Sequence, residues 1–189
     1  MKEQNKQGTN HVLIGLGSNL NPDQNISEAL RLLGSQVSIR NVSSIYQSPA
    51  VGSSGPDYLN SAVLIETDSS LDMLRKNILY PIENQLKRIR SSDKYMDRTI
   101  DLDVFIYNQT VTDPDLWTQV HVAVPASELL PEFKNPITGE IISQAAKRLL
   151  PGINIQIRSD LSRKFPRIGA VLLLWIYYPG IPVWSICYF

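Results

Sequence analysis

The sequence predicts an α/β (α+β) fold of the ferredoxin-like type, an antiparallel sheet with both helices packed on one face. Several stretches show the alternation of apolar side chains that is typical of strands, and two show the 3.6-residue period of amphipathic helices. Their order along the chain is strand, helix, strand, strand, helix, strand (βαββαβ), which is the split βαβ arrangement. This prediction leaves the opposite face of the sheet open to carry a site.

The first half of the pattern begins with a strand over residues 12–17. Asn21 and Pro22 then predict a helix start, with Asn as the cap and Pro at the first helical position. Apolar residues continue at helical spacing to Gly34, which is placed to end that helix. The next two strands and the Gly- and Pro-rich loop between them are predicted over residues 37–46, 58–67 and 48–57.

The second half begins with a helix start at residues 68–71. Apolar residues keep a 3.6-residue period up to Arg90, and Pro81 is expected to kink or interrupt this helix. A strand over 100–107 follows, and a further helix is predicted near 141–150. Strand alternation sends two sets of side chains to opposite faces. One set is Ile100, Leu102, Val104 and Ile106, and the other is Asp101 and Asp103.

Length and charge limit the classes of function. A chain of 189 residues is expected to form one domain, over residues 11–165, after a polar extension over 1–10. The 18 basic and 18 acidic residues cancel, so no overall field recruits nucleic acid or an acidic membrane surface. We therefore expect a small-molecule ligand and a monomer. A single cysteine, Cys187, excludes an intramolecular disulfide and favours the cytoplasm, and the polar N-terminus contains no secretory signal.

The C-terminal segment over residues 166–189 is an apolar tail of undetermined role. Pro179, Gly180 and Pro182 interrupt it short of the roughly 20 residues that a membrane-spanning helix needs. Three alternatives remain: a tail that packs back on the domain, a merely adhesive segment, and a segment foreign to the fold. A membrane anchor is the least favoured interpretation.

Asp101 and Asp103 are the most informative pair in the chain. Two carboxylates on one face of a strand are costly if they are buried without partners, whereas a shared Mg²⁺ site would use them. The alternative is an ordinary solvated polar face, and a basic helix end can likewise simply complement the helix dipole. Their closeness to a basic run favours a metal-assisted phosphate site. That run consists of Lys87, Arg88, Arg90, Lys94 and Arg98.

Four motifs in register make the chain resemble the 6-hydroxymethyl-7,8-dihydropterin pyrophosphokinases of folate biosynthesis. The resemblance covers residues 11–108, with weaker similarity to about residue 152. The motifs are Gly15-Leu-Gly-Ser-Asn-Leu20, Tyr46-Gln-Ser-Pro-Ala-Val-Gly52, Pro56-Asp-Tyr-Leu-Asn60, and Ile82-Glu83 through Arg98-Thr-Ile-Asp-Leu-Asp103.

The resemblance implies transfer of pyrophosphate from ATP to the pterin hydroxymethyl oxygen, with release of AMP. It implies that Asp101 and Asp103 hold two Mg²⁺ ions, which neutralise phosphate charge and align the attack. Arg88 and Arg98 join the two aspartates as catalytic residues, because guanidinium clamps phosphate oxygens with paired donors. The implied nucleotide-binding residues are Glu83, Arg88, Arg90, Lys94, Arg98 and Val104.

The resemblance also implies a pterin pocket. Asn60 would bind the edge of the flat bicycle, and aromatic side chains would cover its faces. Asp101 would also orient the hydroxymethyl group. Tyr58 taken alone fits a core tyrosine as well, and its neighbour Asn60 favours the pocket. The implied pterin-binding residues are Ser48, Pro49, Val51, Tyr58, Asn60, Tyr95, Asp101 and His121.

The chain departs from the family pattern mainly on the nucleotide side. The connection after Tyr107 is short, lacks the usual Pro-His pair and Arg, and brings His121 to an aromatic pterin-stacking position. Nucleotide affinity is then either weaker or supported by Trp117 and Gln119. The other departures are Tyr95 for Trp, Lys94 for Arg, Ser91 for Lys, and Tyr80 and Pro81 near a usual nucleotide-contacting Gln.

Two further classes of function remain as alternatives. One is a degenerate, non-catalytic module that binds pterin or nucleotide. The other is a nucleic-acid-binding ferredoxin-like domain, since such sheets stack bases on exposed aromatic residues. The neutral net charge argues against this second class.

Overall fold

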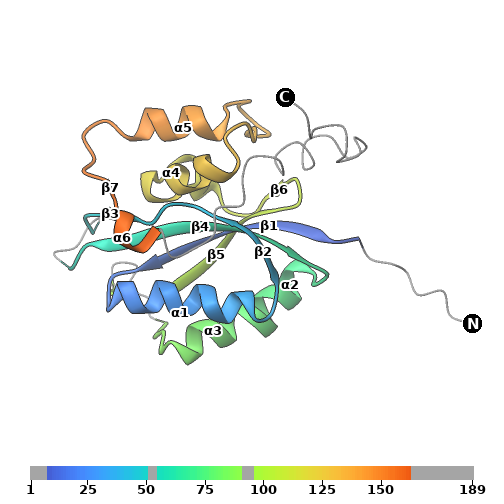
Figure 1. The fold of residues 1–189 in the computed structure, drawn as a ribbon. Helices are drawn as coiled ribbons and strands as arrows, with labels where there is room; N and C mark the ends of the chain where they lie inside the picture. The colour runs from blue at the N-terminus through green and yellow to red at the C-terminus, as the bar shows by residue number, and fades with distance from the viewer. Residues whose placement is uncertain (1–7, 51–54, 91–95, 163–189) are drawn as a thin grey trace, which may run out of the picture.

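A computed structural model of the protein describes residues 8–50, 55–90 and 96–162, which form one sheet with helices on both faces (Figure 1). The apolar tail, and Val51, Ser91, Lys94 and Tyr95, lie outside the described residues. The first elements are β1 (Asn10–Ser18), α1 (Pro22–Gly34), β2 (Ser38–Val42), β3 (Tyr46–Ser48), β4 (Tyr58–Thr67), α2 (Leu71–Leu74), the π-helix η1 (Arg75–Leu79) and α3 (Tyr80–Gln85). The others are β5 (Asp101–Tyr107), β6 (Thr110–Val111), the 3₁₀ helix η2 (Pro114–Trp117), α4 (Val120–Leu129), α5 (Ile142–Leu149), β7 (Gln156–Ile157) and α6 (Ser159–Ser162).

The described strands form a 7-stranded sheet in the order β6-β5-β1-β4-β3-β7, with β2 also paired to β4. All its pairs are antiparallel, as the ferredoxin-like prediction requires. The strand expected over 37–46 is divided into β2 and β3. Ser43 lies between them, and its Oγ accepts a hydrogen bond from the backbone N–H of Ala62 at 2.9 Å, so a side chain substitutes there for part of the ladder.

α1 lies under the sheet together with α2, η1 and α3 (Figure 1). Its apolar side chains Ile26, Leu30 and Leu33 pack in the main core. The prediction that Asn21 caps this helix with its side chain was wrong. Asn21 has φ 46° and makes no side-chain cap, so Pro22 starts the helix through its fixed φ alone.

The second helical segment is interrupted, as Pro81 predicted. Proline has no N–H to donate, and the turn before it widens to the π-helix η1, in which the N–H of Tyr80 bonds the carbonyl of Arg75. The periodicity indicated a helical segment up to Arg90, but the segment ends at Gln85. Lys87 has φ 61°, a left-handed conformation that turns the chain out of the helix.

The second face of the sheet is half covered. α4 and α5 lie above it (Figure 1), and a second core forms there around Leu13, Leu64 and Trp117. The rest of this face stays open, in agreement with the prediction. Glu128 fixes α4 to the sheet, because it accepts the hydroxyl of Tyr46 and, at 2.7 Å, the N–H of Ser44.

A bulge in β5 changes one predicted facing. Leu13 pairs with Ile106 and Ile14 with Val104, so Phe105 is an extra residue on β5. Ile106 consequently packs in the second core, and the prediction that it shares a face with Leu102 was wrong. Asp101, Asp103 and Phe105 all remain on the open side, where they line a common pocket.

No helix within residues 8–50, 55–90 and 96–162 is long and apolar enough to cross a membrane.

Gly15 on β1 is expected to tolerate no larger residue. A Cβ at this position would lie 2.2 Å from a ring carbon of Phe105, whereas a Cβ at Gly17 would meet only Asn60 Oδ1, at 3.4 Å. Gly15→Ala should therefore lower the free energy of unfolding by about 1–3 kcal/mol through overpacking. Gly17→Ala, the same change on the same strand face, is the control in thermal unfolding. Equal melting temperatures for the two variants would contradict this packing argument.

Candidate functional site

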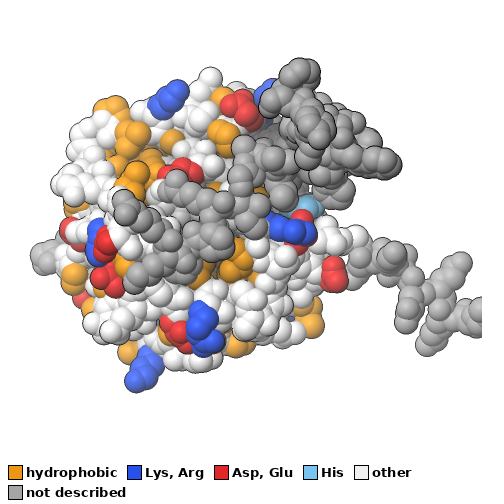
Figure 2. Space-filling model, in the orientation of Figure 1, with side chains coloured by type: hydrophobic (Ala, Val, Ile, Leu, Met, Phe, Trp, Pro, Cys, Tyr) orange, Lys and Arg blue, Asp and Glu red, His pale blue; other side chains and the backbone are white. Residues whose placement is uncertain are grey.

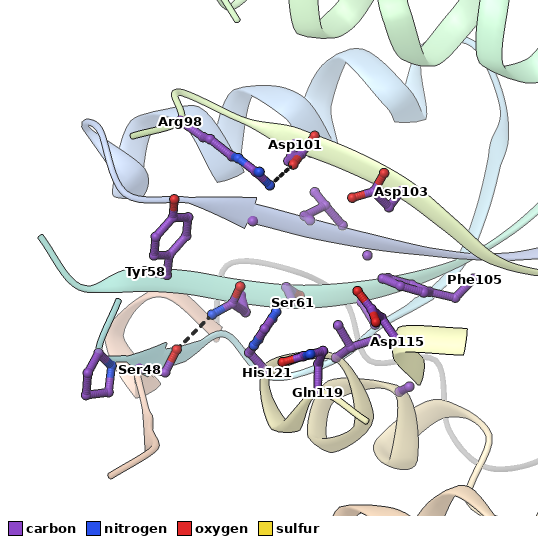
Figure 3. Close-up of a pocket in the computed structure, with 18 residues that line it drawn as sticks. Ser48, Tyr58, Ser61, Arg98, Asp101, Asp103, Phe105, Asp115, Gln119 and His121 are labelled. Carbon is purple, nitrogen blue, oxygen red and sulfur yellow. Dashed lines mark hydrogen bonds and ion pairs between the residues drawn. The ribbon is translucent and has the colours of Figure 1, made fainter. Parts of the chain in front are cut away.

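A cavity of about 560 Å³ lies between the open part of the sheet and α4 (Figure 3). β1 supplies its floor with Gly15 and Gly17. The ring of Phe105 occupies the space beside Gly15, and Asn60 Oδ1 lies 3.4 Å from where a Cβ of Gly17 would be. Two polar walls face each other across this floor. The first contains Arg98, Asp101 and Asp103, the second contains Asp115, Gln119 and His121, and Ser48, Pro49, Tyr58 and Asn60 close one end.

Two arginines converge on Asp101, a pairing that the sequence analysis did not predict. Arg98 forms an ion pair with Asp101 Oδ2, and Arg88 Nη2 lies 3.4 Å from both of its carboxylate oxygens. The side chains of Arg88 and Asp101 are only 10% and 14% exposed, so water screens this cluster weakly. Arg88 Nε is buried without a hydrogen-bond partner among the described residues, so this guanidinium retains unused donor capacity.

The electrostatic environment of Asp103 is less favourable for a carboxylate than that of Asp101. Asp103 is exposed to solvent on β5, but partial desolvation by the surrounding pocket raises its pKa to about 7, and the nearby carboxylates of Asp101, Glu83 and Asp113 add to the effect. Arg98 opposes the shift. The second aspartate therefore lies among negative charges that the described side chains do not fully compensate, an arrangement that fits a divalent cation.

The turn after β1 holds the chain segment that presents Arg98. Ser18 Oγ donates to the carbonyl of Thr99 at 2.5 Å, and Asn19 Oδ1 accepts the N–H of Arg98 at 2.7 Å. Asn19 Nδ2 also donates to Asp97 at 2.6 Å. The Gly-Ser-Asn motif is therefore explained by backbone positioning, a role that sequence reasoning did not assign to Ser18 and Asn19.

Glu83 connects the nucleotide-side arginines to β5. Its carboxylate is 1% exposed, accepts the N–H of Leu102 at 3.0 Å through Oε1, and bonds Arg90 through Oε2. Burial raises the pKa of Glu83, and the bonds from Leu102 and Arg90 oppose that shift. Glu83 therefore holds Arg90 and does not line the pocket. Val104 is 2% exposed in the main core, so nucleotide contact through its side chain is excluded.

The pterin-side residues that the structure describes lie together. Asn60 is 5% exposed, and its Nδ2 donates to Ser48 Oγ at 3.1 Å, which fixes the orientation of the amide. Tyr58 and His121 approach from different walls of the pocket (Figure 3). Burial lowers the pKa of His121, with Asp115 opposing and Arg98 assisting that shift, so the imidazole is neutral at neutral pH.

The sequence analysis left several residues that line the pocket unassigned, among them Phe105 and Asp115. Phe105 and Asp115 line the cavity, and period-two alternation with Asp101 and Asp103 was the available signal for Phe105. Asp115 had no comparable signal, because it lies on a one-turn 3₁₀ helix. Gln119 lines the pocket as anticipated, but Trp117 is 7% exposed in the second core, so the suggestion that it supports nucleotide binding was wrong.

Asp103→Asn should stabilise the protein more at alkaline than at acidic pH. The folded state keeps the Asp103 proton up to about pH 7 while the unfolded chain loses it near 3.9, so wild-type stability falls as pH rises between these values. Asparagine removes this dependence. Melting temperatures of the wild type and of Asp103→Asn at about pH 5 and about pH 8 measure this pH dependence. Asp72→Asn, on the exposed face of α2, is the control. A variant-minus-wild-type difference that does not grow with pH would refute the raised pKa.

Residues 13–131 match the sequence model of the 7,8-dihydro-6-hydroxymethylpterin-pyrophosphokinase (HPPK) family. The 2-amino-4-hydroxy-6-hydroxymethyldihydropteridine pyrophosphokinase of Haemophilus influenzae is 34% identical over 148 residues, which cover 71% of this chain and 90% of that protein. The protein of the same name from Synechocystis sp. is 30% identical over 149 residues, covering 73% of this chain and 75% of that one.

The fold also has solved counterparts. A crystal structure of Plasmodium falciparum HPPK-DHPS with pterin and p-hydroxybenzoate superimposes with a TM-score of 0.62 at 13% identity. The match covers 77% of this chain and 44% of the Plasmodium chain, so this protein spans less than half of that bifunctional one. The fold, the pocket and the extent of the sequence match agree, and the chain belongs to the 7,8-dihydro-6-hydroxymethylpterin-pyrophosphokinase family.

Proposed function

We propose that this protein transfers pyrophosphate from ATP to the hydroxymethyl group of 6-hydroxymethyl-7,8-dihydropterin in folate biosynthesis. Membership of the family supports the reaction. The observation that carries it in this chain is the grouping of Asp101 and Asp103 with Arg88 and Arg98, both arginines being paired with Asp101, beside a pocket end that contains Tyr58 and Asn60. Phosphate chemistry needs the first group of residues, and a flat heterocycle suits the second.

The reaction is an in-line displacement at phosphorus. The pterin hydroxymethyl oxygen forms a bond to the β-phosphorus of ATP and releases its proton. The bond from that phosphorus to the oxygen bridging the α- and β-phosphates breaks, and AMP leaves with the electron pair. Little covalent work falls to the protein, so its contribution is positioning and electrostatic stabilisation.

Asp101 and Asp103 are the residues that would hold two Mg²⁺ ions. Their carboxylates share one face of β5. Desolvation and then the neighbouring carboxylates raise the pKa of Asp103, and a bound cation would favour its carboxylate form. When bound, such ions supply charge neutralisation for the phosphate oxygens. Arg88 and Arg98 orient Asp101 and present further donors to phosphate, because each guanidinium carries five N–H groups.

The pterin would lie over the β1 floor, between Tyr58 and His121. Asn60 would then bind its amide edge, since Ser48 has already fixed the side-chain amide. A neutral His121 offers a flat stacking surface and avoids placing a second positive charge beside Arg98. Asp101, which lines the same pocket, would accept the hydroxyl proton of the hydroxymethyl group in a hydrogen bond. Val51 and Tyr95 remain proposed contacts, as does Lys94 for the nucleotide.

The competing functions have less support. The non-catalytic module finds no support in the relatives, which carry the name pyrophosphokinase. Nucleic-acid binding has less support because basic side chains do not gather on the face of the molecule shown in Figure 2. Among the described residues of that face, Lys and Arg side chains (blue) are dispersed among acidic ones. A continuous basic surface would be expected for backbone binding.

Asp103→Asn should abolish turnover while the protein stays folded. The amide removes the charge that holds the cation, so AMP release from ATP, Mg²⁺ and 6-hydroxymethyl-7,8-dihydropterin should fall by at least about 10²-fold. Asp72→Asn serves as the matched control, and a reaction without pterin gives the background. Normal turnover by folded Asp103→Asn would refute the metal assignment, and wild-type protein that binds pterin without releasing AMP would favour the non-catalytic module.

Mg²⁺ binding to the free protein should strengthen as pH rises. The cation needs the carboxylate form of Asp103, whose pKa is raised to about 7, so binding must displace a proton below that pH. The apparent dissociation constant should therefore fall about tenfold between pH 6 and pH 8. Isothermal titration calorimetry in two buffers of different ionisation enthalpy would detect the released proton. A pH-independent constant would place the cation away from Asp103.

A further inference from the structure

We infer that Tyr80 is a positioning residue for nucleotide binding, acting through Arg90 to present a fixed guanidinium to the phosphates of ATP. The inference rests on the proposed function and adds to it a role for Tyr80, to which the sequence analysis assigned none. Tyr80, Glu83 and Arg90 form the unit that carries it, and we call them the Arg90 clamp.

The Arg90 clamp holds its guanidinium from two sides. The Cζ atom of Arg90 lies 4.5 Å from the centroid of the Tyr80 ring, within the range of a cation–π contact. The same guanidinium donates from Nη2 to Glu83 Oε2. A ring against one face and a carboxylate at one edge together restrict the rotation of a side chain that otherwise loses about 2 kcal/mol of rotamer entropy on ordering.

Glu83 ties the Arg90 clamp to the strand that carries the catalytic aspartates. Its other oxygen, Oε1, accepts the N–H of Leu102 at 3.0 Å, and Leu102 lies between Asp101 and Asp103 in the sequence. The Glu83 carboxylate is 1% exposed, so the bonds it makes are shielded from water. The position of Arg90 is therefore fixed relative to the two carboxylates proposed to hold the cations.

The helix geometry explains why Tyr80 can do this. Tyr80 and Glu83 are three residues apart on α3, so their side chains project from neighbouring positions of one face. The helix then ends, and Lys87 with φ 61° reverses the chain so that Arg90 returns over that face. The π-helix before Pro81 sets the rotation of this last turn relative to the rest of the segment.

Arg90 retains donors for a ligand. Its side chain is 59% exposed, and Nη2 is the guanidinium nitrogen that bonds Glu83, whereas a guanidinium carries five N–H donors in all. A preoriented guanidinium of this kind suits phosphate oxygens, because less freedom is lost when the contact forms.

The test measures binding of the Mg²⁺ complex of α,β-methylene-ATP, which cannot react, to the full chain. Tyr80→Leu should raise its dissociation constant about two- to fivefold, the factor that an exposed cation–π contact contributes. Arg90→Ala should raise it at least about tenfold, as expected for a lost charge-assisted hydrogen bond. Tyr80→Phe keeps the ring and should retain wild-type affinity. Met73→Ala, on the same helical segment, is the surface control.

Three readouts separate positioning from a structural role. The double variant should bind no more weakly than Arg90→Ala alone, because Tyr80 acts through Arg90. In turnover, Tyr80→Leu should raise the KM for ATP while kcat and the KM for pterin stay near wild type. Mg²⁺-tripolyphosphate should lose affinity by the same factor as the ATP analogue, which assigns the contact to phosphate and not to the base.

Several outcomes would overturn the inference: unchanged affinity in Tyr80→Leu, additive losses in the double variant, weakened binding in Tyr80→Phe, or a loss confined to the adenosine-containing probe. Pterin-dependent AMP release by the wild type distinguishes these outcomes from failure of the proposed function. If the wild type releases AMP and Tyr80→Leu binds normally, only the clamp is rejected. If the wild type neither binds the analogue nor releases AMP, both proposals are rejected.

Discussion

The organisation of the site depends on a concentration of negative charge around β5. Asp101 and Asp103 project from one face of the strand, and Glu83 is buried behind it. Burying several carboxylates together is unfavourable unless each has a partner. Arg88 and Arg98 compensate Asp101, Leu102 N–H and Arg90 compensate Glu83, and Asp103 is left with a raised pKa. The charge of Asp103 is therefore not fully compensated by the described side chains, and this is where phosphate and cations are proposed to bind.

Alternation along the strands and helical periodicity predicted the architecture because both follow directly from burial. The facing of Asp101 and Asp103 and the interruption at Pro81 were confirmed for this reason. The face expected to be open is half covered by α4 and α5, and the part they leave open contains the pocket. Local backbone geometry could be predicted less well from the sequence. Neither the left-handed conformation of Asn21 nor the bulge at Phe105 is encoded by composition, since each depends on contacts with distant segments.

The second wall of the pocket was the hardest part to predict. α4 contains Pro125 and alternates Val with other residues at its start, which weakens any helical signal. The helix forms because it can bury Ala126 and Leu129 against the sheet, a tertiary effect that local propensity does not report. His121 was identified by resemblance, whereas Asp115 and the burial of Trp117 became evident only with the path of the short connection before α4.

The bonds of Glu128 bear on how the pocket accepts its ligand. One carboxylate joins α4, which carries His121, to Tyr46 on β3 and to Ser44, which lies just before that strand. The gap between helix and sheet is therefore fixed by protein contacts that no ligand has to supply. A ligand that enters the cavity therefore meets a helix and a sheet that are already held in place. None of its binding free energy has to be spent on drawing one onto the other.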